Sequence, residues 1–134
     1  MQVHELATRA AVAPHIVRYY ARLGLLRPTR NPRNKYKNFS QDDLLRLVFI
    51  RKAKWLGFTL GEVRLVLEMS YMGKTPCPLV REVVRRRVVD NARGLAELAA
   101  LQKRMQSALR KWRGMPDGVP DGQAICRLIE AVVE

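Results

Sequence analysis

The sequence is poor in several residue types, and each shortage excludes a class of protein. Only two cysteines, Cys77 and Cys126, and two histidines occur among its 134 residues. Two cysteines 49 positions apart make neither a disulfide framework nor a CxxC motif, so we expect a reducing compartment. No apolar run approaches the roughly 18 residues of a membrane span, and the N-terminus lacks a signal-peptide core. These absences predict a cytoplasmic protein without a membrane partner.

Acidic residues are also scarce, with 12 Asp and Glu against 25 Lys and Arg, for a net charge of +13. The excess is uneven, because residues 1–75 carry 14 basic and 5 acidic residues (+9) and residues 76–134 carry 11 and 7 (+4). A basic first half predicts a polyanionic partner, and nucleic acid is the commonest one. An anionic membrane surface is the alternative, but no helix pairs a wide Trp/Phe/Leu face with a broad basic face.

Signs of catalysis are absent as well. Neither His4 nor His15 has a neighbour that would complete a catalytic pair, and no glycine-rich phosphate loop occurs. We therefore predict that the chain is not an enzyme. Two classes remain, a DNA-binding regulator and an architectural coiled-coil protein that binds DNA weakly and without sequence preference.

The first 26 residues have the pattern of a helix-turn-helix. Apolar residues at helical spacing predict a short first helix, a turn at 11–13 and a second helix that begins at Pro14. One face of that second helix is polar and carries His15, Arg18, Tyr19 and Arg22. Arginine can make two hydrogen bonds to guanine or phosphate, and tyrosine can bond a phosphate, so this face suits DNA. A small helical domain with the same pattern by chance is the alternative.

The segment 27–39 is of another kind, since its prolines and asparagines break helices. Basic residues alternate with other polar residues over 33–38, which is the period of an extended ribbon with a basic face. The residues that this ribbon would present to DNA are Arg33, Lys35, Tyr36 and Lys37. A basic hairpin after a helix-turn-helix is typical of a wing on the phosphate backbone, and a solvated charged loop is the alternative.

Two further helices follow, each with a capping box at its start. Ser40–Asp43 resembles such a box with Asp in place of Glu, and Thr59–Glu62 is a full one. Gly57 separates the two helices. The first of them presents Arg51 and Lys54 outward, which extends the basic surface.

The stretch 78–113 carries an unbroken heptad seam of 3.5-residue period. The seam positions are Val84, Val88, Asn91, Leu95, Leu98, Gln102, Met105, Leu109 and Trp112. Some 36 residues at about 1.5 Å each make a rod of roughly 54 Å, too long to be buried in so small a chain. We therefore expect a second copy as its partner, with Asn91 and Gln102 setting the register. A long helix lying along its own domain is the alternative. Thr75 suits the N-cap, and Gly114 ends the rod.

After Gly114 comes a turn-rich loop that contains Asp117 and Asp121, followed by a short helix. Its apolar face would hold Ile125, Leu128, Ile129, Val132 and Val133, and Asp121 would cap its start. Cys126 lies beside that face near the helix start, where a small buried core residue is the alternative to a functional thiol.

Several linked motifs resemble the MerR family of bacterial transcription regulators over essentially the whole chain. They are residues 17–26, 34–40, 42–44 and 56–63. The resemblance implies a mainly α fold: a winged helix-turn-helix head (1–75), a long antiparallel coiled-coil dimerisation helix (76–113), and an effector-binding loop with a short helix (114–134). Arg18 matches the recognition-helix arginine and Tyr36 the wing tyrosine. Two positions depart from the family, since a glycine is usual at Lys35 and a glutamate is common at Ala21.

The resemblance also implies a mechanism. Such dimers occupy double-stranded promoter DNA whose two recognition elements are badly spaced, and an effector makes them distort it so that RNA polymerase uses both. Deforming DNA between half-sites is a physically reasonable source of specificity. Both activation and repression are compatible with this behaviour.

The short C-terminal part resembles the metal-sensing branch of the family. Cys77 matches the rod cysteine and Cys126 the second loop cysteine, while the first loop cysteine is absent. The implied site joins Cys77 of one chain to Cys126, with Asp117 or Asp121, of the other. Such a donor set suits a divalent ion of the zinc, cadmium, lead or mercury class. Thiol oxidation of the two cysteines and a non-metal ligand are the alternatives.

Overall fold

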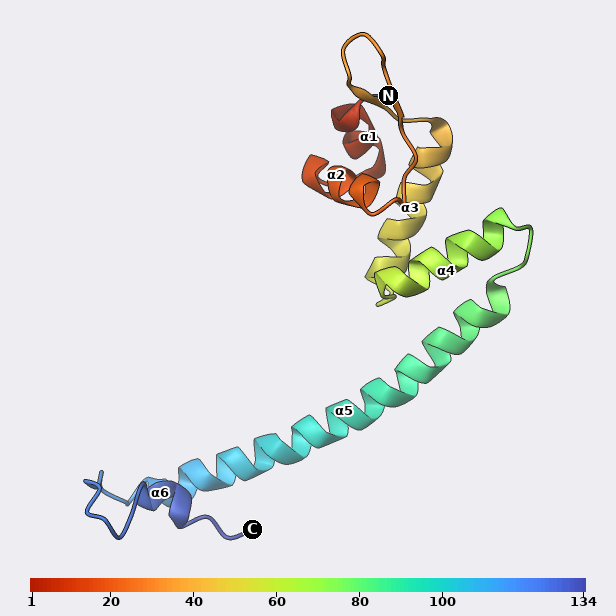
Figure 1. Ribbon diagram of the computed structural model, residues 1–134. Helices are drawn as coiled ribbons and strands as arrows, with labels where there is room; N and C mark the ends of the chain where they lie inside the picture. Colours follow the sequence, from red (N-terminus) through yellow and green to blue (C-terminus); the bar gives the residue numbers. More distant parts are fainter. The chain divides into compact units, whose positions relative to one another are not determined.

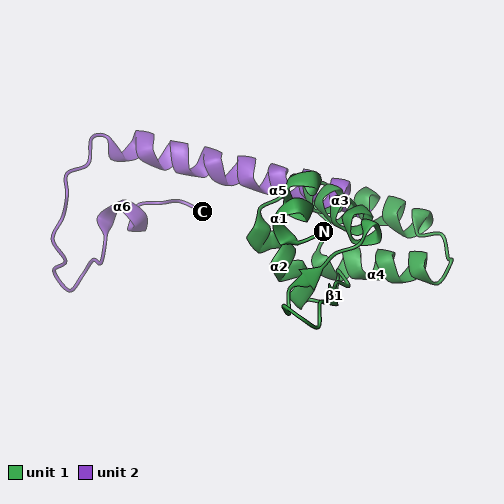
Figure 2. Cartoon of the chain, turned by 90° about the horizontal axis from the view of Figure 1, so that it is seen from above, with its two compact units in different colours: residues 1–85 green, residues 86–134 purple.

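The computed structural model describes all 134 residues and divides them into two compact units, residues 1–85 and 86–134 (Figure 2). In chain order the elements are α1 (Val3–Ala10), α2 (Pro14–Arg22), β1 (Thr29–Arg30), β2 (Lys37–Asn38), α3 (Gln41–Trp55), α4 (Leu60–Tyr71), α5 (Cys77–Trp112) and α6 (Arg127–Glu130) (Figure 1). The expected mainly α fold is confirmed. Helix α5 begins in the first unit and continues into the second.

None of the helices combines the length and the apolar character needed to cross a lipid bilayer.

The first two helices form the predicted helix-turn-helix. Between them Ala11 adopts a left-handed conformation (φ 57°), and the predicted turn ends where Pro14 opens α2. Gly24, with φ 77°, follows α2 and reverses the chain. Leu6 and Val17, one from each helix, are completely buried in the core of unit 1. The turn therefore sets α2 across α1 with its polar face outward.

The wing is shorter than the ribbon that the alternating sequence predicts. Only Lys37 and Asn38 form β2, which pairs antiparallel with β1, and the segment between the strands is a turn. Two asparagine side chains hold this turn, because Asn31 Oδ1 accepts from the amide of Arg33 and Asn34 Oδ1 from that of Tyr36, both at 2.9 Å. Asparagine side chains that bond nearby amides compete with a strand ladder. The extended ribbon through Arg33 and Lys35 was therefore a wrong prediction.

Lys35 occupies the position in this turn where a glycine is usual in the family that the sequence resembles. Its φ is +60°, and its amide donates to the carbonyl of Asn31 at 2.8 Å. A left-handed backbone costs an L-residue about 1 kcal/mol, which explains the preference for glycine. The turn keeps its form with lysine, and a third cation is gained between Arg33 and Lys37.

Both predicted capping boxes are confirmed. Ser40 Oγ accepts from the amide of Asp43 at 3.2 Å, and Asp43 Oδ2 accepts in return from the amide of Ser40 at 3.0 Å. At α4, Thr59 Oγ1 and the amide of Glu62 are 3.1 Å apart, and Glu62 Oε1 accepts from the amide of Thr59 at 2.9 Å. Each box satisfies two amides that the first turn of a helix leaves without partners.

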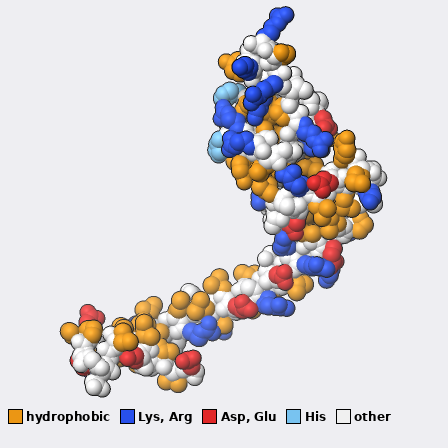
Figure 3. Space-filling view, in the orientation of Figure 1, with side chains coloured by type: hydrophobic (Ala, Val, Ile, Leu, Met, Phe, Trp, Pro, Cys, Tyr) orange, Lys and Arg blue, Asp and Glu red, His pale blue; other side chains and the backbone are white.

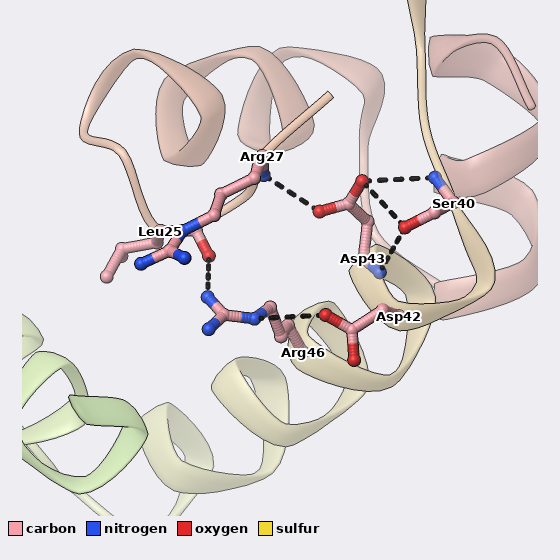
Figure 4. A network of polar contacts seen from close by, with 6 residues as sticks. All are labelled: Leu25, Arg27, Ser40, Asp42, Asp43 and Arg46. Carbon is pink, nitrogen blue, oxygen red and sulfur yellow. Dashed lines mark hydrogen bonds and ion pairs between the residues drawn. The ribbon is translucent and has the colours of Figure 1, made fainter. Parts of the chain in front are cut away.

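Asp43 also fastens the wing to α3, as Figure 4 shows. Its side chain is buried, and Oδ1 accepts from the amide of Arg27 at 2.8 Å, at the point where the chain leaves the core towards β1. Beside it, Arg46 Nη1 donates to the carbonyl of Leu25 at 3.2 Å, and Arg46 Nε lies 3.5 Å from Asp42 Oδ2. One buried carboxylate therefore holds both ends of the wing.

The core of unit 1 takes side chains from α1 to α4 and from the segments between them. Phe39 anchors the end of the wing, and Phe58 anchors the turn between α3 and α4. Val80, Val83 and Val84 of α5 pack against this core. The first turns of the long helix are therefore part of the head.

In unit 2 the last helix is shorter than predicted. It covers only Arg127–Glu130, so Val132 and Val133 lie beyond it. Asp121 does not cap it, and the Glu130 carboxylate instead accepts from the amide of Cys126 at 3.1 Å. Four residues form a single turn, and the β-branched valines do not favour extending it. Trp112 Nε1 donates to the carbonyl of Leu128 at 2.9 Å, which links this turn to the end of α5.

We expect Asp43→Ala to lower the free energy of unfolding by about 2–4 kcal/mol, because it leaves buried backbone amides without acceptors. Asp42→Ala is the matched control. Its side chain is 76% exposed and its ion pair is long, so we expect a loss below about 1 kcal/mol. Urea unfolding of the full chain at fixed protein concentration, followed by circular dichroism, gives both values. Equal losses in the two variants would show that the hydrogen bonds of Asp43 to the Arg27 and Ser40 amides do not stabilise the fold as expected.

Candidate functional site

The outward face of α2 presents the four residues predicted to contact DNA. His15, Arg18, Tyr19 and Arg22 are all exposed, while Val17 and Tyr20 between them are buried. The guanidinium of Arg22 lies 6.0 Å from the centre of the Tyr19 ring, and that ring packs against Tyr20 at 5.7 Å. The aromatic contacts restrict Tyr19 and Arg22, so the face is partly preorganised for a polyanion.

Tyr20 supports this face from beneath. Burial raises the pKa of its phenol, and the neighbouring Tyr19 raises it further. Its hydroxyl therefore stays neutral at all ordinary pH values, and the ring acts as a packing platform.

The wing adds a second basic surface. Arg33, Lys35 and Tyr36 are exposed in its turn, and Lys37 is half-buried in β2. Tyr36 and Lys37 line a hollow of about 290 Å³ together with Arg30. The predicted wing residues are therefore grouped at the end of the hairpin even though they do not form a continuous ribbon.

Arg30 is a residue that the sequence reasoning missed. In the antiparallel ladder it pairs directly with Lys37, so the two side chains project from the same face. Like charges opposite one another destabilise a hairpin unless an anion lies between them. The pairing becomes visible only in the strand register. In the sequence Arg30 precedes the alternating segment and has the appearance of a loop residue.

The last turns of α3 carry further basic side chains. Arg51 and Lys54 are exposed, as predicted, and next to them Trp55 is 86% exposed. In Figure 3, Lys and Arg side chains gather with the pale-blue histidines on one side of unit 1. Basic groups with interleaved aromatic rings are typical of a nucleic-acid interface.

The two cysteines lie in different units and both are exposed. Cys77 is the first residue of α5, and its amide lies 3.4 Å from Thr75 Oγ1, the residue predicted to cap this helix. Cys126 directly precedes α6 and is exposed, so the alternative of a buried core residue is wrong. It lines a hollow of about 220 Å³ in unit 2, together with Asp117.

The two candidate carboxylates of the loop differ in their contacts. Asp121 accepts from the amides of Gln123 and Ala124 at 2.9 and 3.2 Å and pairs with Arg127 at 3.1 Å. The Gln123 amide, then the Ala124 amide and the Arg127 guanidinium, lower the pKa of this carboxyl. Asp117 makes no such contacts and faces the same hollow as Cys126. Asp121 therefore has amide and guanidinium partners within the loop, whereas Asp117 has none.

Within one chain, no three His, Cys, Asp or Glu side chains are grouped closely enough to hold a metal ion. The predicted site draws its two thiols from different chains, and it stays a prediction.

The heptad seam of α5 is open to solvent along most of its length, and the helix has no fully buried residue. Val88, Leu95, Leu98, Met105 and Leu109 are each more than half exposed, and Asn91 and Gln102 are exposed as well. Val84 and Trp112, at the two ends, are half-buried. An exposed, mostly apolar stripe of this length, interrupted only by two amides, is typical of an interaction surface.

Comparison with known proteins places the chain among regulators. A family model described as "MerR HTH family regulatory protein" matches residues 1–70, and one described as "MerR, DNA binding" matches residues 44–108. The HTH-type transcriptional regulator PA4778 of Pseudomonas aeruginosa, itself uncharacterized, is 30% identical over 121 residues, covering 90% of both chains. The mercuric resistance operon regulatory protein of Bacillus cereus is 25% identical and covers 99% of this chain and 97% of its own.

The fold is also that of a solved structure. The transcription regulator PbrR691 from Ralstonia metallidurans CH34, crystallised in complex with lead(II), superposes with a TM-score of 0.74 at 23% identity. The match covers 98% of this chain and 99% of the other. It confirms the helix-turn-helix head followed by a long helix.

We expect Arg18→Ala to weaken binding to a duplex selected by the wild-type protein by about 1–3 kcal/mol, the typical value of a two-point arginine contact. Arg93→Ala is the control, because it removes the same charge from an exposed position of α5 in unit 2. Fluorescence anisotropy at several salt concentrations gives affinity and salt slope together. If both variants bind as wild type does, Arg18 is not a recognition residue.

Proposed function

The chain belongs to the MerR family of helix-turn-helix regulatory proteins, and we propose that it acts as a dimer that changes the shape of promoter DNA when an effector binds. It is a DNA-binding transcription regulator and not an enzyme. The observation that carries the proposal is the basic and aromatic face of α2 together with a basic wing in the same unit. Both surfaces are attached to one packed core.

On DNA, we assign base and phosphate contacts to α2 and phosphate contacts to the wing and the end of α3. The proposed contact residues are His15, Arg18, Tyr19, Arg22, Arg33, Lys35, Tyr36, Lys37, Arg51 and Lys54. Arg30 joins them because of its pairing with Lys37. Phosphate contacts position a protein without reading sequence, so specificity rests on Arg18 and its neighbours in α2.

Dimerisation follows from the open seam of α5. The seam positions 7 and 14 residues on either side of Leu98 match, so two antiparallel copies centred there oppose Val84 to Trp112 and Asn91 to Met105. This pairing buries the exposed leucines and leaves the seam amides to set the register. It also brings the start of one α5, with Cys77, to the end of the other, where the loop begins.

The effector we propose is a divalent metal ion of the zinc, cadmium, lead or mercury class. Cys77 of one chain and Cys126 of the other would supply thiolates, and Asp117 would supply an oxygen. Thiolates suit all four ions, and a carboxylate is acceptable to zinc, cadmium and lead. Two similar proteins support the class, since one is named for mercuric resistance and the other was crystallised with lead(II).

Such a site would connect effector and DNA through α5. Cys77 precedes by three residues the first valine of α5 that packs on the head core. A metal that fixes Cys77 to the other chain would bias the orientation of the heads, and a coupling of about 1–3 kcal/mol is typical of such a link. Bent or untwisted DNA would then present both promoter elements to RNA polymerase. The site of action would be the bacterial cytoplasm.

We expect Leu98→Asp to shift the chain from dimer to monomer, because it places two facing carboxylates at the centre of the seam. Ala100→Asp carries the same change on the outer face of α5 and should leave the dimer intact. Sedimentation velocity at several protein concentrations measures both. A Leu98→Asp chain that stays dimeric would exclude α5 as the interface.

We expect the reduced dimer to take one of the four metal ions from a coloured chelator, and Cys77→Ser and Cys126→Ser each to abolish this competition. Asp117→Asn should weaken binding at least about tenfold, because it removes the negative charge of a ligand and even outer-shell partners are worth about 10- to 100-fold, whereas Asp121→Asn should have a smaller effect. The comparison is matched, since both changes remove one loop carboxylate. If no metal competes, thiol oxidation or a non-metal ligand becomes the signal, while DNA binding stays as proposed.

A further inference from the structure

Unit 1 contains a hollow of about 340 Å³ that neither DNA binding nor the thiol site uses. It lies where the turn after α2, the start of the wing, α3 and α4 come together. Three arginines and several apolar side chains form its walls. The residues that matter here are Leu25, Arg27, Arg46, Arg64, Leu67 and Tyr71.

The three arginines come from three different segments, and the fold holds two of them in place. Arg46 Nη1 donates to the carbonyl of Leu25 at 3.2 Å, and Arg64 Nη2 donates to the carbonyl of Leu23. Each guanidinium has five N–H donors, so one such bond fixes its position and leaves others for a ligand. Arg27 makes no ion pair, and its guanidinium lies 5.2 Å from the centre of the Tyr71 ring.

The charge of this hollow is not balanced from within. Glu68 is its one acidic lining residue, and it forms no ion pair with any of the three arginines. Asp42 contacts Arg46 at 3.5 Å from outside the hollow, with its own side chain 76% exposed. Converging guanidinium groups repel one another, and a carboxylate or phosphate can engage them with paired hydrogen bonds. The chemistry of the walls therefore selects an anion.

The rest of the wall is apolar and suits an anion that also carries an apolar group. Leu25, Leu67 and Met72 line the hollow, and the Tyr71 ring closes one side. The volume is near the lower limit of the roughly 300–1,000 Å³ of small-molecule pockets, so it suits a molecule with a single ring. A bare inorganic anion would leave these apolar groups without a partner.

We propose that this hollow binds a small organic anion, with its carboxylate or phosphate on Arg27, Arg46 and Arg64 and its apolar body against Leu67 and Tyr71. The site lies wholly inside unit 1, uses neither cysteine and does not rest on the metal proposal. A ligand there bridges the segment that leads into the wing and α4, which leads into α5. It therefore acts on the parts of the head that position the wing.

The test is an NMR titration of the ¹⁵N-labelled full chain with sodium benzoate at constant ionic strength. We expect saturable shifts at the amides of Leu67 and Tyr71, and none with benzyl alcohol, which has the same ring without the charge. Arg27→Gln should weaken the affinity about 10- to 100-fold, as loss of a charged hydrogen bond does. It is the cleanest variant, because the Arg27 side chain makes no hydrogen bond and its amide still reaches Asp43.

Lys52→Gln is the matched control, since it removes one exposed charge from α3 outside the hollow. It should bind benzoate as wild type does. Three results would overturn the proposal: no saturable shift with benzoate, equal affinity for inorganic phosphate and benzoate, or equal losses in the two variants. Weakened DNA binding in Arg27→Gln without any benzoate binding would assign the arginines to the DNA backbone instead.

Discussion

The head of this protein depends on one buried carboxylate. Asp43 accepts hydrogen bonds from the amides of Arg27 and Ser40, the residues on either side of the wing. The wing has two residues in each strand, which is too little sheet to hold itself in place. Its basic residues therefore keep their place because Asp43 fixes both ends of the hairpin on the first turn of α3.

Around this anchor the head accumulates positive charge that it does not neutralise. Arg30 lies opposite Lys37, Lys35 accepts a strained backbone conformation, and three arginines converge near the turn after α2. The first two arrangements cost stability in the isolated chain. Such a basic surface suits a polyanionic partner, since the repulsion between its side chains is relieved when phosphate or another anion is bound. The same basic residues therefore favour anion binding and lower the stability of the free head.

The long helix has a different role at each end. Its first turns pack valines on the core of the head, whereas its later turns expose an apolar seam and end beside the C-terminal loop. Cys77 stands at the packed end and Cys126 beyond the exposed end. In the proposed site, a constraint applied at Cys77 would act three residues before Val80, which packs on the core of the head. The proposed effector site would therefore influence the head directly through the first turn of α5.

Local signals in the sequence were enough to predict the first five helices, both capping boxes, the turn before Pro14 and the exposed face of α2. Each of these depends on residues a few positions apart, where periodicity and hydrogen-bonding side chains decide the outcome. Contacts between distant residues decided the rest. No short-range pattern in the sequence predicts the pairing of Arg30 with Lys37 or the hydrogen bond from the Arg27 amide to Asp43. The same holds for the hollow that Arg27, Arg46 and Arg64 line together. The different contacts of Asp117 and Asp121, alike in sequence, also appear only in the folded loop, where Asp121 accepts from two amides.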